Sequence, residues 1–298
     1  MNEEQIFLPD KFDCPTLISF SGGRTSGYML YKILESYNWK LPDDVHVTFA
    51  NTGKEMPQTL DFIRACEKNW SVKVYWLEMD IHDERPIYRT KEVTYETASR
   101  NGEPYEALIK RKKMLPNVVA RLCTIHLKID VMKRFMQQRG YKEWANVIGL
   151  RYDEPRRVAK QRKQNESGKN KWESLVPLYD NKVMVGDVGN FWANNDFDLN
   201  LPNHNGKTLA GNCDLCFLKG TRTLINIIRE RADLADWWIE QEQQIEKLNK
   251  GTKYENKFVS TATFRKDSSY EELVEMAKLD AKQTELFDDD GRSCFCHD

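Results

Sequence analysis

The chain has 298 residues, of which 40% are hydrophobic and 31% are charged, and its formal net charge is −1. This composition excludes a disordered polar chain and is typical of one large folded domain or two smaller ones. The near-neutral charge gives no overall attraction to nucleic acid or to an anionic membrane. No apolar run approaches the roughly 20 residues that span a bilayer, and the N-terminus lacks a basic signal region, so we expect a cytoplasmic protein without membrane association.

Short apolar runs alternate with amphipathic stretches in the first half of the chain. Buried strands are predicted at the apolar runs 17–20, 45–49, 72–77 and 147–150. Helices are predicted at the amphipathic stretches 27–37, 57–70 and 125–139. This order predicts an α/β fold with an open, mostly parallel sheet and helices on both faces, which binds ligands at the carboxyl ends of its strands.

A glycine pair flanked by hydroxyl side chains follows the first predicted strand: Ser21-Gly22-Gly23-Arg24-Thr25-Ser26. Glycines let consecutive backbone N–H groups face one phosphate, and the start of the next helix adds positive partial charge. The hydroxyls can donate further hydrogen bonds, and Arg24 supplies a cation. An ordinary turn is the alternative. A Walker loop is excluded because no Gly-Lys-Ser/Thr follows at the required spacing.

A second turn, Thr52-Gly53, ends the second predicted strand. Because carboxyl ends of parallel strands share one edge of the sheet, we expect this turn and the first glycine loop to converge on one ligand. This placement favours a nucleotide site over an ordinary turn.

Residues 156–171 contain seven basic side chains and one acid among Gln, Asn, Ser and Gly, and we predict a loop there. A solvated charged loop is the simpler interpretation. The alternative is a mobile flap that closes over an anionic substrate or contacts a nucleic-acid backbone.

The pattern becomes mainly helical in the last third of the chain, with helices predicted at 221–244 and 269–282. We therefore expect a nucleotide-binding α/β domain at 1–205 and a cysteine-containing, mainly helical region at 206–298.

The chain has seven cysteines, and Cys213 and Cys216 have the Cys-x-x-Cys spacing that can grip one metal centre. In a cytosolic chain this favours metal or redox chemistry over a disulfide framework. With Cys123 and His126 the pair could form a Cys3His zinc site. Cys66 falls on the apolar face of a predicted helix and is expected in the core.

Two other interpretations of the cysteines stay open. A redox dithiol could form at the Cys-x-x-Cys pair or at Cys294 and Cys296, or the thiols could simply be small buried side chains.

Five segments in chain order resemble motifs of one family: 20–26, 51–59, 121–128, 149–157 and 211–217. The first looks like the pyrophosphate loop, SGG-x-[DT]-S, of the adenine nucleotide alpha-hydrolase superfamily. The order of all five resembles the phosphoadenosine-phosphosulfate (PAPS) reductase-like branch, over roughly residues 16–220. The resemblance implies the Rossmann-like fold of these proteins with a PP-loop.

The resemblance also implies site residues and ligands. It implies an adenine nucleotide, either ATP with Mg²⁺ or a sulfonucleotide (PAPS or adenylyl sulfate). The implied nucleotide-binding residues are Ser21, Gly22, Gly23, Arg24, Thr25, Ser26, Thr52, Gly53, Gly149, Arg151 and Arg157. The implied catalytic residues are Arg24, Arg151, Glu154 and Cys296.

A [4Fe-4S] cluster is implied at Cys123, Cys213 and Cys216, with Zn²⁺ as the alternative metal. The iron–sulfur branch of the family has two adjacent upstream cysteines, whereas Cys123 stands alone here. Cys296 or Cys294 would then supply the fourth ligand, or one iron would stay open to hold a sulfur atom.

Two enzymatic functions and one binding function follow from these motifs. The intact loop favours an ATP pyrophosphatase that adenylates an acceptor for sulfur transfer. A thiol-dependent reductase of PAPS or adenylyl sulfate is the alternative, with Cys294 or Cys296 beside His297 as the attacking thiol. A zinc-stabilised nucleic-acid-binding adaptor is the third. Expected partners are a sulfur donor protein or a thioredoxin-like reductant, and a nucleic acid as acceptor.

Overall fold

A computed structural model describes residues 14–204, 207–208, 210–211, 213–251 and 263–279. Its centre is a six-stranded sheet of order β4-β3-β2-β1-β5-β6, in which only β4 is antiparallel to its neighbour. The strands are β1 Thr16–Ser19, β2 Val45–Ala50, β3 Val74–Ile81, β4 Tyr88–Val93, β5 Trp144–Val147 and β6 Trp172–Leu175. The predicted α/β fold with a mostly parallel sheet is confirmed.

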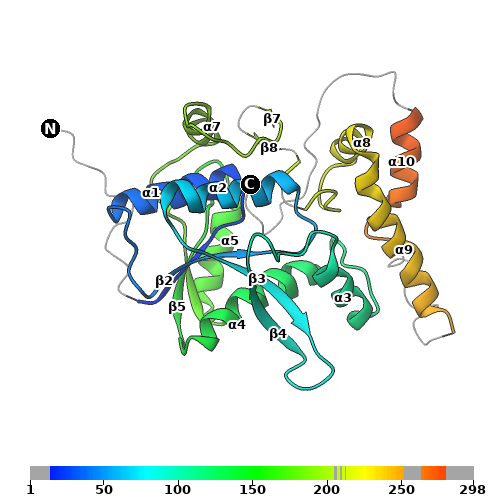
Figure 1. Cartoon of the computed structure of the whole chain (residues 1–298), viewed down its shortest axis with the longest axis horizontal. Helices are drawn as coiled ribbons and strands as arrows, with labels where there is room; N and C mark the ends of the chain where they lie inside the picture. Colours follow the sequence, from blue (N-terminus) through cyan, green and yellow to red (C-terminus); the bar gives the residue numbers. More distant parts are fainter. Residues whose placement is uncertain (1–13, 205–206, 209, 212, 252–262, 280–298) are drawn as a thin grey trace.

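Helices cover both faces of this sheet. In Figure 1, α1 (Arg24–Ser36) and α2 (Pro57–Trp70) lie above the sheet, and α3 (Glu103–Lys112) and α4 (Asp130–Gln138) lie below it. All residues of β1 and β2 are buried, as is usual for strands covered on both faces. The strand order reverses at β1, which pairs with β2 on one side and β5 on the other. Such a reversal opens a crevice at the carboxyl ends of the strands.

Three predicted elements differ most from the structure. β5 ends at Val147, so residues 148–150 form the turn after the strand rather than its end. β3 begins at Val74 and continues to Ile81 because it pairs with the edge strand β4, which was not predicted. The predicted helix 125–139 is a π-helix, η1 (Cys123–Ile129), continued by α4.

The loop predicted at 156–171 is wrong, because most of it is helix α5 (Pro155–Glu166). Pro155 occupies the first turn, where its missing N–H costs nothing, and Arg, Lys and Gln are good helix formers. Val158 and Gln161, three residues apart, are buried and fix one face of the helix on the protein.

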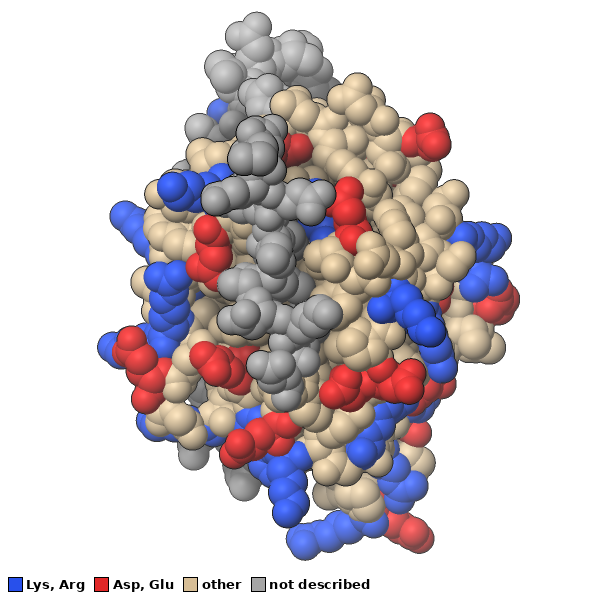
Figure 2. All heavy atoms as spheres, turned by 90° about the vertical axis from the view of Figure 1, so that its left-hand side faces the viewer, with Lys and Arg blue, Asp and Glu red and all other residues tan. Residues whose placement is uncertain are grey.

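On the face at the left of Figure 1, basic and acidic side chains are intermingled, as on an ordinary solvated surface (Figure 2).

The described residues from 213 onward, at 213–251 and 263–279, are mainly helical, as predicted. They form α8 (Thr221–Glu230), the 3-10 turn η2 (Ala232–Leu234), α9 (Ala235–Asn249) and α10 (Tyr270–Leu279), which lie together at one end of the molecule (Figure 1). The single helix predicted at 221–244 is broken at Arg231, whose side chain pairs with Asp233. Smaller elements precede it: α6 (Pro177–Asp180), α7 (Val185–Ala193), β7 (Asn203–His204) and β8 (Lys207–Thr208).

Within the described ranges, every helix is too short or too polar to cross a membrane.

Candidate functional site

The glycine loop after β1 has the backbone of a phosphate loop. Gly22 has a φ of +78°, and a Cβ there would lie 2.6 Å from Thr59 Cγ2. Gly23 is extended and directly precedes α1, so no side chain caps the helix at this position. Ser26 Oγ donates to the Gly23 carbonyl at 3.0 Å and lies 2.9 Å from Ser21 Oγ. The first N–H groups of α1 are thus presented beside hydroxyls, which is a favourable environment for an anion.

The turn after β5 contacts this loop, because β1 and β5 are neighbours in the sheet. A Cβ on Gly149 would lie 3.4 Å from Ser26 Cα, and Arg151 Nη1 donates to Thr25 Oγ1 at 2.8 Å. Arg151 Nε also donates to Asp153 Oδ1 at 3.1 Å, which fixes the guanidinium. The loop after β1 and the turn after β5 therefore form one wall of the predicted nucleotide site.

Glu154 holds the arginines of this turn in place. Its Oε2 accepts a hydrogen bond from the Arg151 backbone N–H at 3.0 Å, and its Oε1 pairs with Arg157. The structure thus brings Gly149, Arg151, Glu154 and Arg157 together beside the glycine loop.

Arg24 is directed elsewhere. Its guanidinium is 3% exposed and donates to Asp198 Oδ1 at 2.7 Å, Thr208 Oγ1 at 2.6 Å and the Leu201 carbonyl at 2.8 Å. These partners give Arg24 a structural role, in which it ties α1 to the segment 198–208. The contact of Arg24 with phosphate stays a prediction, and the guanidinium that lies against the loop is that of Arg151.

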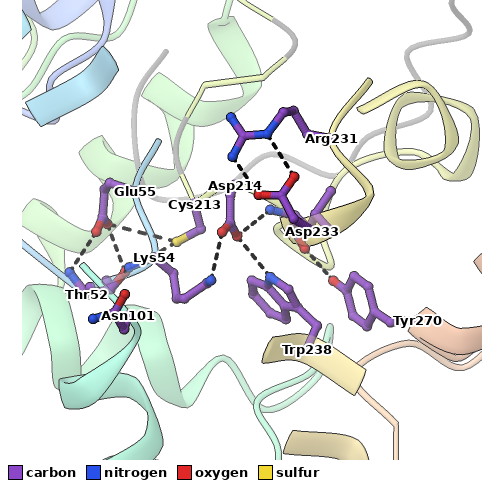
Figure 3. A network of polar contacts seen from close by, with 12 residues as sticks. Thr52, Lys54, Glu55, Asn101, Cys213, Asp214, Arg231, Asp233, Trp238 and Tyr270 are labelled. Atoms are coloured by element: carbon purple, nitrogen blue, oxygen red, sulfur yellow. Dashed lines mark hydrogen bonds and ion pairs between the residues drawn. The ribbon is translucent and has the colours of Figure 1, made fainter. Parts of the chain in front are cut away.

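The turn after β2 joins the predicted nucleotide site to the cysteines. Thr52 donates through its backbone N–H to Glu55 Oε2 at 3.0 Å and through Oγ1 to Glu55 Oε1 at 2.9 Å. Glu55 forms an antiparallel β-bridge with Cys213, whose Sγ lies 3.6 Å from Thr52 Oγ1 (Figure 3). Burial raises the pKa of Glu55, and Lys128 Nζ, 3.9 Å away, opposes this shift.

Three cysteines lie around one buried tyrosine. Burial raises the pKa of Tyr105 well above its usual range, and the nearby thiols of Cys123, Cys213 and Cys216 raise it further. The Tyr105 hydroxyl has no well-formed hydrogen bond among the described residues. Cys123 begins the π-helix η1, an irregularity that is frequent at functional sites.

The Cys213 thiol is protonated in this arrangement. Burial raises the pKa of Cys213 to about 12. In the part of the chain that the structure describes, the His, Cys, Asp and Glu side chains form no group of three that could already hold a metal ion. The Cys3His zinc site is therefore not assembled there. His126 Nδ1 instead lies 3.0 Å from Asp130 Oδ2, and its ring stacks on Tyr88.

Of the remaining cysteine predictions, one is confirmed and the others lie outside the described residues. Cys66 is fully buried within α2, which confirms its place in the core. Cys294 and Cys296, including the predicted catalytic and metal-binding roles of Cys296, lie outside the described residues.

The family model of the phosphoadenosine phosphosulfate reductase domain matches residues 15–200. This chain belongs to the PAPS reductase family. The match ends close to the last residues of the α/β region and covers the glycine loop and the turns after β2 and β5.

Two relatives and one solved structure are similar to this PAPS reductase family member. The uncharacterized nin region protein ORF290 of Escherichia phage lambda is 30% identical over 215 residues, covering 70% of this chain and 67% of its own. The uncharacterized protein MJ0066 of Methanocaldococcus jannaschii is 22% identical over 171 residues, which are 57% of this chain and only 30% of that protein.

The solved structure is the U34-tRNA thiolase NcsA from Methanococcus maripaludis with its [4Fe-4S] cluster. It is 13% identical, with a TM-score of 0.40, and the match covers 93% of this chain and 75% of that chain. A likeness of this extent supports no statement about activity.

Sequence reasoning missed a buried ion pair that connects the turn after β2 to the Cys-x-x-Cys segment. Lys54 Nζ lies 2.8 Å from Asp214 Oδ2, and Trp238 Nε1 donates to Asp214 Oδ1 at 2.9 Å (Figure 3). Lys54 follows Gly53, and Asp214 lies within the Cys-x-x-Cys pair. No local pattern links two residues 160 positions apart, so only their positions inside motif segments marked them.

Proposed function

We propose that this PAPS reductase family protein is an ATP pyrophosphatase that adenylates an acceptor for sulfur transfer. The observation that carries the proposal is the contact between Cys213 and the Thr52–Glu55 turn. It puts sulfur chemistry next to the turn predicted to hold the nucleotide. A nucleotide that activates an acceptor has to lie within reach of the group that delivers sulfur.

The glycine loop would bind the β- and γ-phosphates of ATP through the N–H groups at the start of α1. Arg151, held between Thr25 and Asp153, would stabilise negative charge that develops at the α-phosphate. An acceptor oxygen forms a bond to the α-phosphorus while the bond from that phosphorus to the bridging oxygen breaks. Pyrophosphate then leaves, and the acceptor carries AMP.

Mg²⁺, when bound, would neutralise charge on the polyphosphate. We assign it no protein ligand, because both carboxylate oxygens of Glu154 already accept from Arg151 and Arg157. Glu154 is then a positioning residue for the two arginines.

The three thiols around Tyr105 suit an iron–sulfur cluster by their donor chemistry, and the Tyr105 hydroxyl could donate a hydrogen bond to a sulfur atom. Cys123, Cys213 and Cys216 would hold the cluster, which when bound would offer an open iron for the sulfur to be transferred. Because Cys213 has a pKa of about 12, it would lose a proton on binding metal.

The sulfonucleotide reductase remains the alternative function. Its attacking group would have to be a thiolate, and a thiol with a pKa of about 12 is protonated at neutral pH. Cys213 is therefore a poor nucleophile, and this function would depend on Cys294 or Cys296.

Nucleotide titration of the full chain tests the choice between the two functions. Calorimetry with ATP and with adenylyl sulfate, each with Mg²⁺, should show tight binding of ATP that Gly22→Ala removes. Release of sulfite from adenylyl sulfate in the presence of a dithiol, without ATP binding, would overturn the proposal.

Metal analysis of anaerobically purified protein tests the cluster. We expect about four iron atoms per chain with acid-labile sulfide. Cys123→Ser, Cys213→Ser or Cys216→Ser should each lower the iron content, whereas Cys14→Ser, at an exposed cysteine, should not. One zinc per chain without iron would contradict the cluster.

A further inference from the structure

A cavity of about 520 Å³ lies away from the glycine loop, where the segment 217–222 meets residues 265–267. Its lining is strongly basic and includes Lys219, Arg222, Arg265 and Lys266, and Asp267 is the single acid among the described lining residues. Asp267 is already paired with Arg265, at 2.7 Å from Nη2. The cavity therefore has an excess of positive charge in a protein whose net charge is −1.

Carbonyl groups help to hold two of the cations in place. Lys219 Nζ donates to the carbonyls of Gly211 at 2.6 Å and Cys213 at 2.8 Å. Arg265 Nη1 donates to the carbonyls of Phe217 at 3.1 Å and Lys219 at 2.8 Å. Carbonyl oxygens orient a side chain without neutralising it, so the charge of Lys219 remains available to a ligand, whereas Arg265 shares its charge with Asp267.

Arg265, one of the lining residues, also retains a buried donor. The residue is 8% exposed, and its buried Nε–H has no hydrogen-bond partner among the described residues. A buried donor without a partner costs about 1–3 kcal/mol, which a bound acceptor would offset.

The start of α8 forms another part of the wall. Gly220, which is extended, precedes the helix and has no side chain to cap it. This ten-residue helix directs its positive end to the cavity. Thr221 Oγ1 accepts from Arg265 Nη2 at 2.8 Å, which joins the helix start to the arginine.

We propose that this cavity is a second phosphate site, separate from the glycine loop, and that it anchors a phosphate group of the acceptor substrate. Guanidinium, ammonium and helix N–H groups together match a phosphate better than a single carboxylate.

We assign the bound phosphate to the acceptor substrate because of where the cavity lies. This assignment rests on the proposed function. Phe217 and Leu218 in the cavity wall directly follow Cys216, and Lys219 connects the wall to Cys213. A substrate anchored here would extend toward the thiols. The phosphate could belong to a small phosphate monoester or to a nucleic-acid strand, since both present the same anionic oxygens.

Charge reversal at Lys266 tests the site without disturbing the core. Lys266 is exposed and forms no ion pair within the described ranges, and Lys40 is an exposed lysine elsewhere that serves as control. With inorganic phosphate as the probe, Lys266→Glu in the full chain should weaken binding about tenfold or more, and Lys40→Glu should not. ATP binding should be unchanged in both variants.

Two further experiments distinguish phosphate binding at this cavity from binding at the nucleotide site. Gly22→Ala should leave the Lys266-dependent phosphate binding intact, so failure of the ATP proposal would not remove it. Displacement of phosphate by a short single-stranded RNA identifies a nucleic acid as the source, and displacement only by glycerol phosphate identifies a small monoester. Phosphate binding that is unchanged in Lys266→Glu and in Lys266→Glu/Arg222→Glu would overturn the proposal.

Discussion

Lys54 and Asp214 form an ion pair that is buried at both ends, with side chains 8% and 5% exposed. Lys54 belongs to the turn after β2, and Asp214 lies between the two cysteines of the Cys-x-x-Cys pair. Asp214 also accepts hydrogen bonds from the Leu215 N–H and from Trp238 on α9. One carboxylate thus connects the predicted nucleotide turn, the cysteines and the C-terminal helices.

Removing only the cation of this pair should lower the free energy of unfolding more than removing both charges. Lys54→Met leaves Asp214 buried without its partner, and the free energy of unfolding should fall by about 3–5 kcal/mol. In Lys54→Met/Asp214→Asn, the Asn oxygen can still accept from Leu215 and Trp238, so much of that loss should be recovered. Urea unfolding of the two variants checks this, and equal losses in both would contradict it.

Gly22→Ala should destabilise the chain and remove ATP binding. Its φ of +78° disfavours a side chain, and the new Cβ would lie 2.6 Å from Thr59 Cγ2 and 2.8 Å from Ile63 Cδ1. Gly168→Ala is the matched control, because Gly168 has a φ of +60° but open space around it. We expect Gly168→Ala to lose about 1 kcal/mol from strain alone. Gly22→Ala should lose clearly more, measured by thermal unfolding and ATP titration.

Arg151→Lys should weaken ATP binding while leaving the fold intact. The Arg151 guanidinium contacts Thr25 and Asp153 at once, and a lysine ammonium cannot reproduce this planar geometry. We expect about a tenfold lower affinity for ATP by calorimetry. Arg162→Lys, at an exposed arginine of α5, is the control. If Arg151→Lys bound ATP like the unmodified chain, Arg151 would have no part in the nucleotide site.

Glu242 should make stability depend on pH between about 4.5 and 7. Burial raises its pKa from 4.5 to about 7, against hydrogen bonds from the Phe264 and Tyr270 N–H groups. In this window the folded state keeps a proton that the unfolded state has released, so the free energy of unfolding falls as pH rises, by up to about 3 kcal/mol.

Unfolding of Glu242→Gln across this pH range provides the measurement. The variant should lose this slope, whereas Glu240→Gln, at an exposed position of the same helix, should keep it. A slope that persists in Glu242→Gln would assign the pH dependence to another group.

Short-range sequence patterns were sufficient to predict those elements whose start and end are marked by their own residues. The helix predicted at 57–70 coincides with α2, because Pro57 marks its start and its apolar spacing continues to Trp70. The glycine loop could be placed from its own residues, since glycine readily adopts the positive φ that Gly22 has in the structure. The basic segment was misjudged because charged side chains say little about helix or loop when only Val158 and Gln161 face the protein.

The sequence by itself determined the α/β order, the family motifs and the chemistry of the side chains, because these depend on residue type and short-range spacing. Only the tertiary structure decided which distant residues meet. Arg24 pairs with Asp198 rather than facing the loop, Lys54 meets Asp214, and the basic cavity forms where 217–222 approaches 265–267. Such contacts depend on how the sheet and the C-terminal helices pack in three dimensions, and no short-range pattern records that geometry.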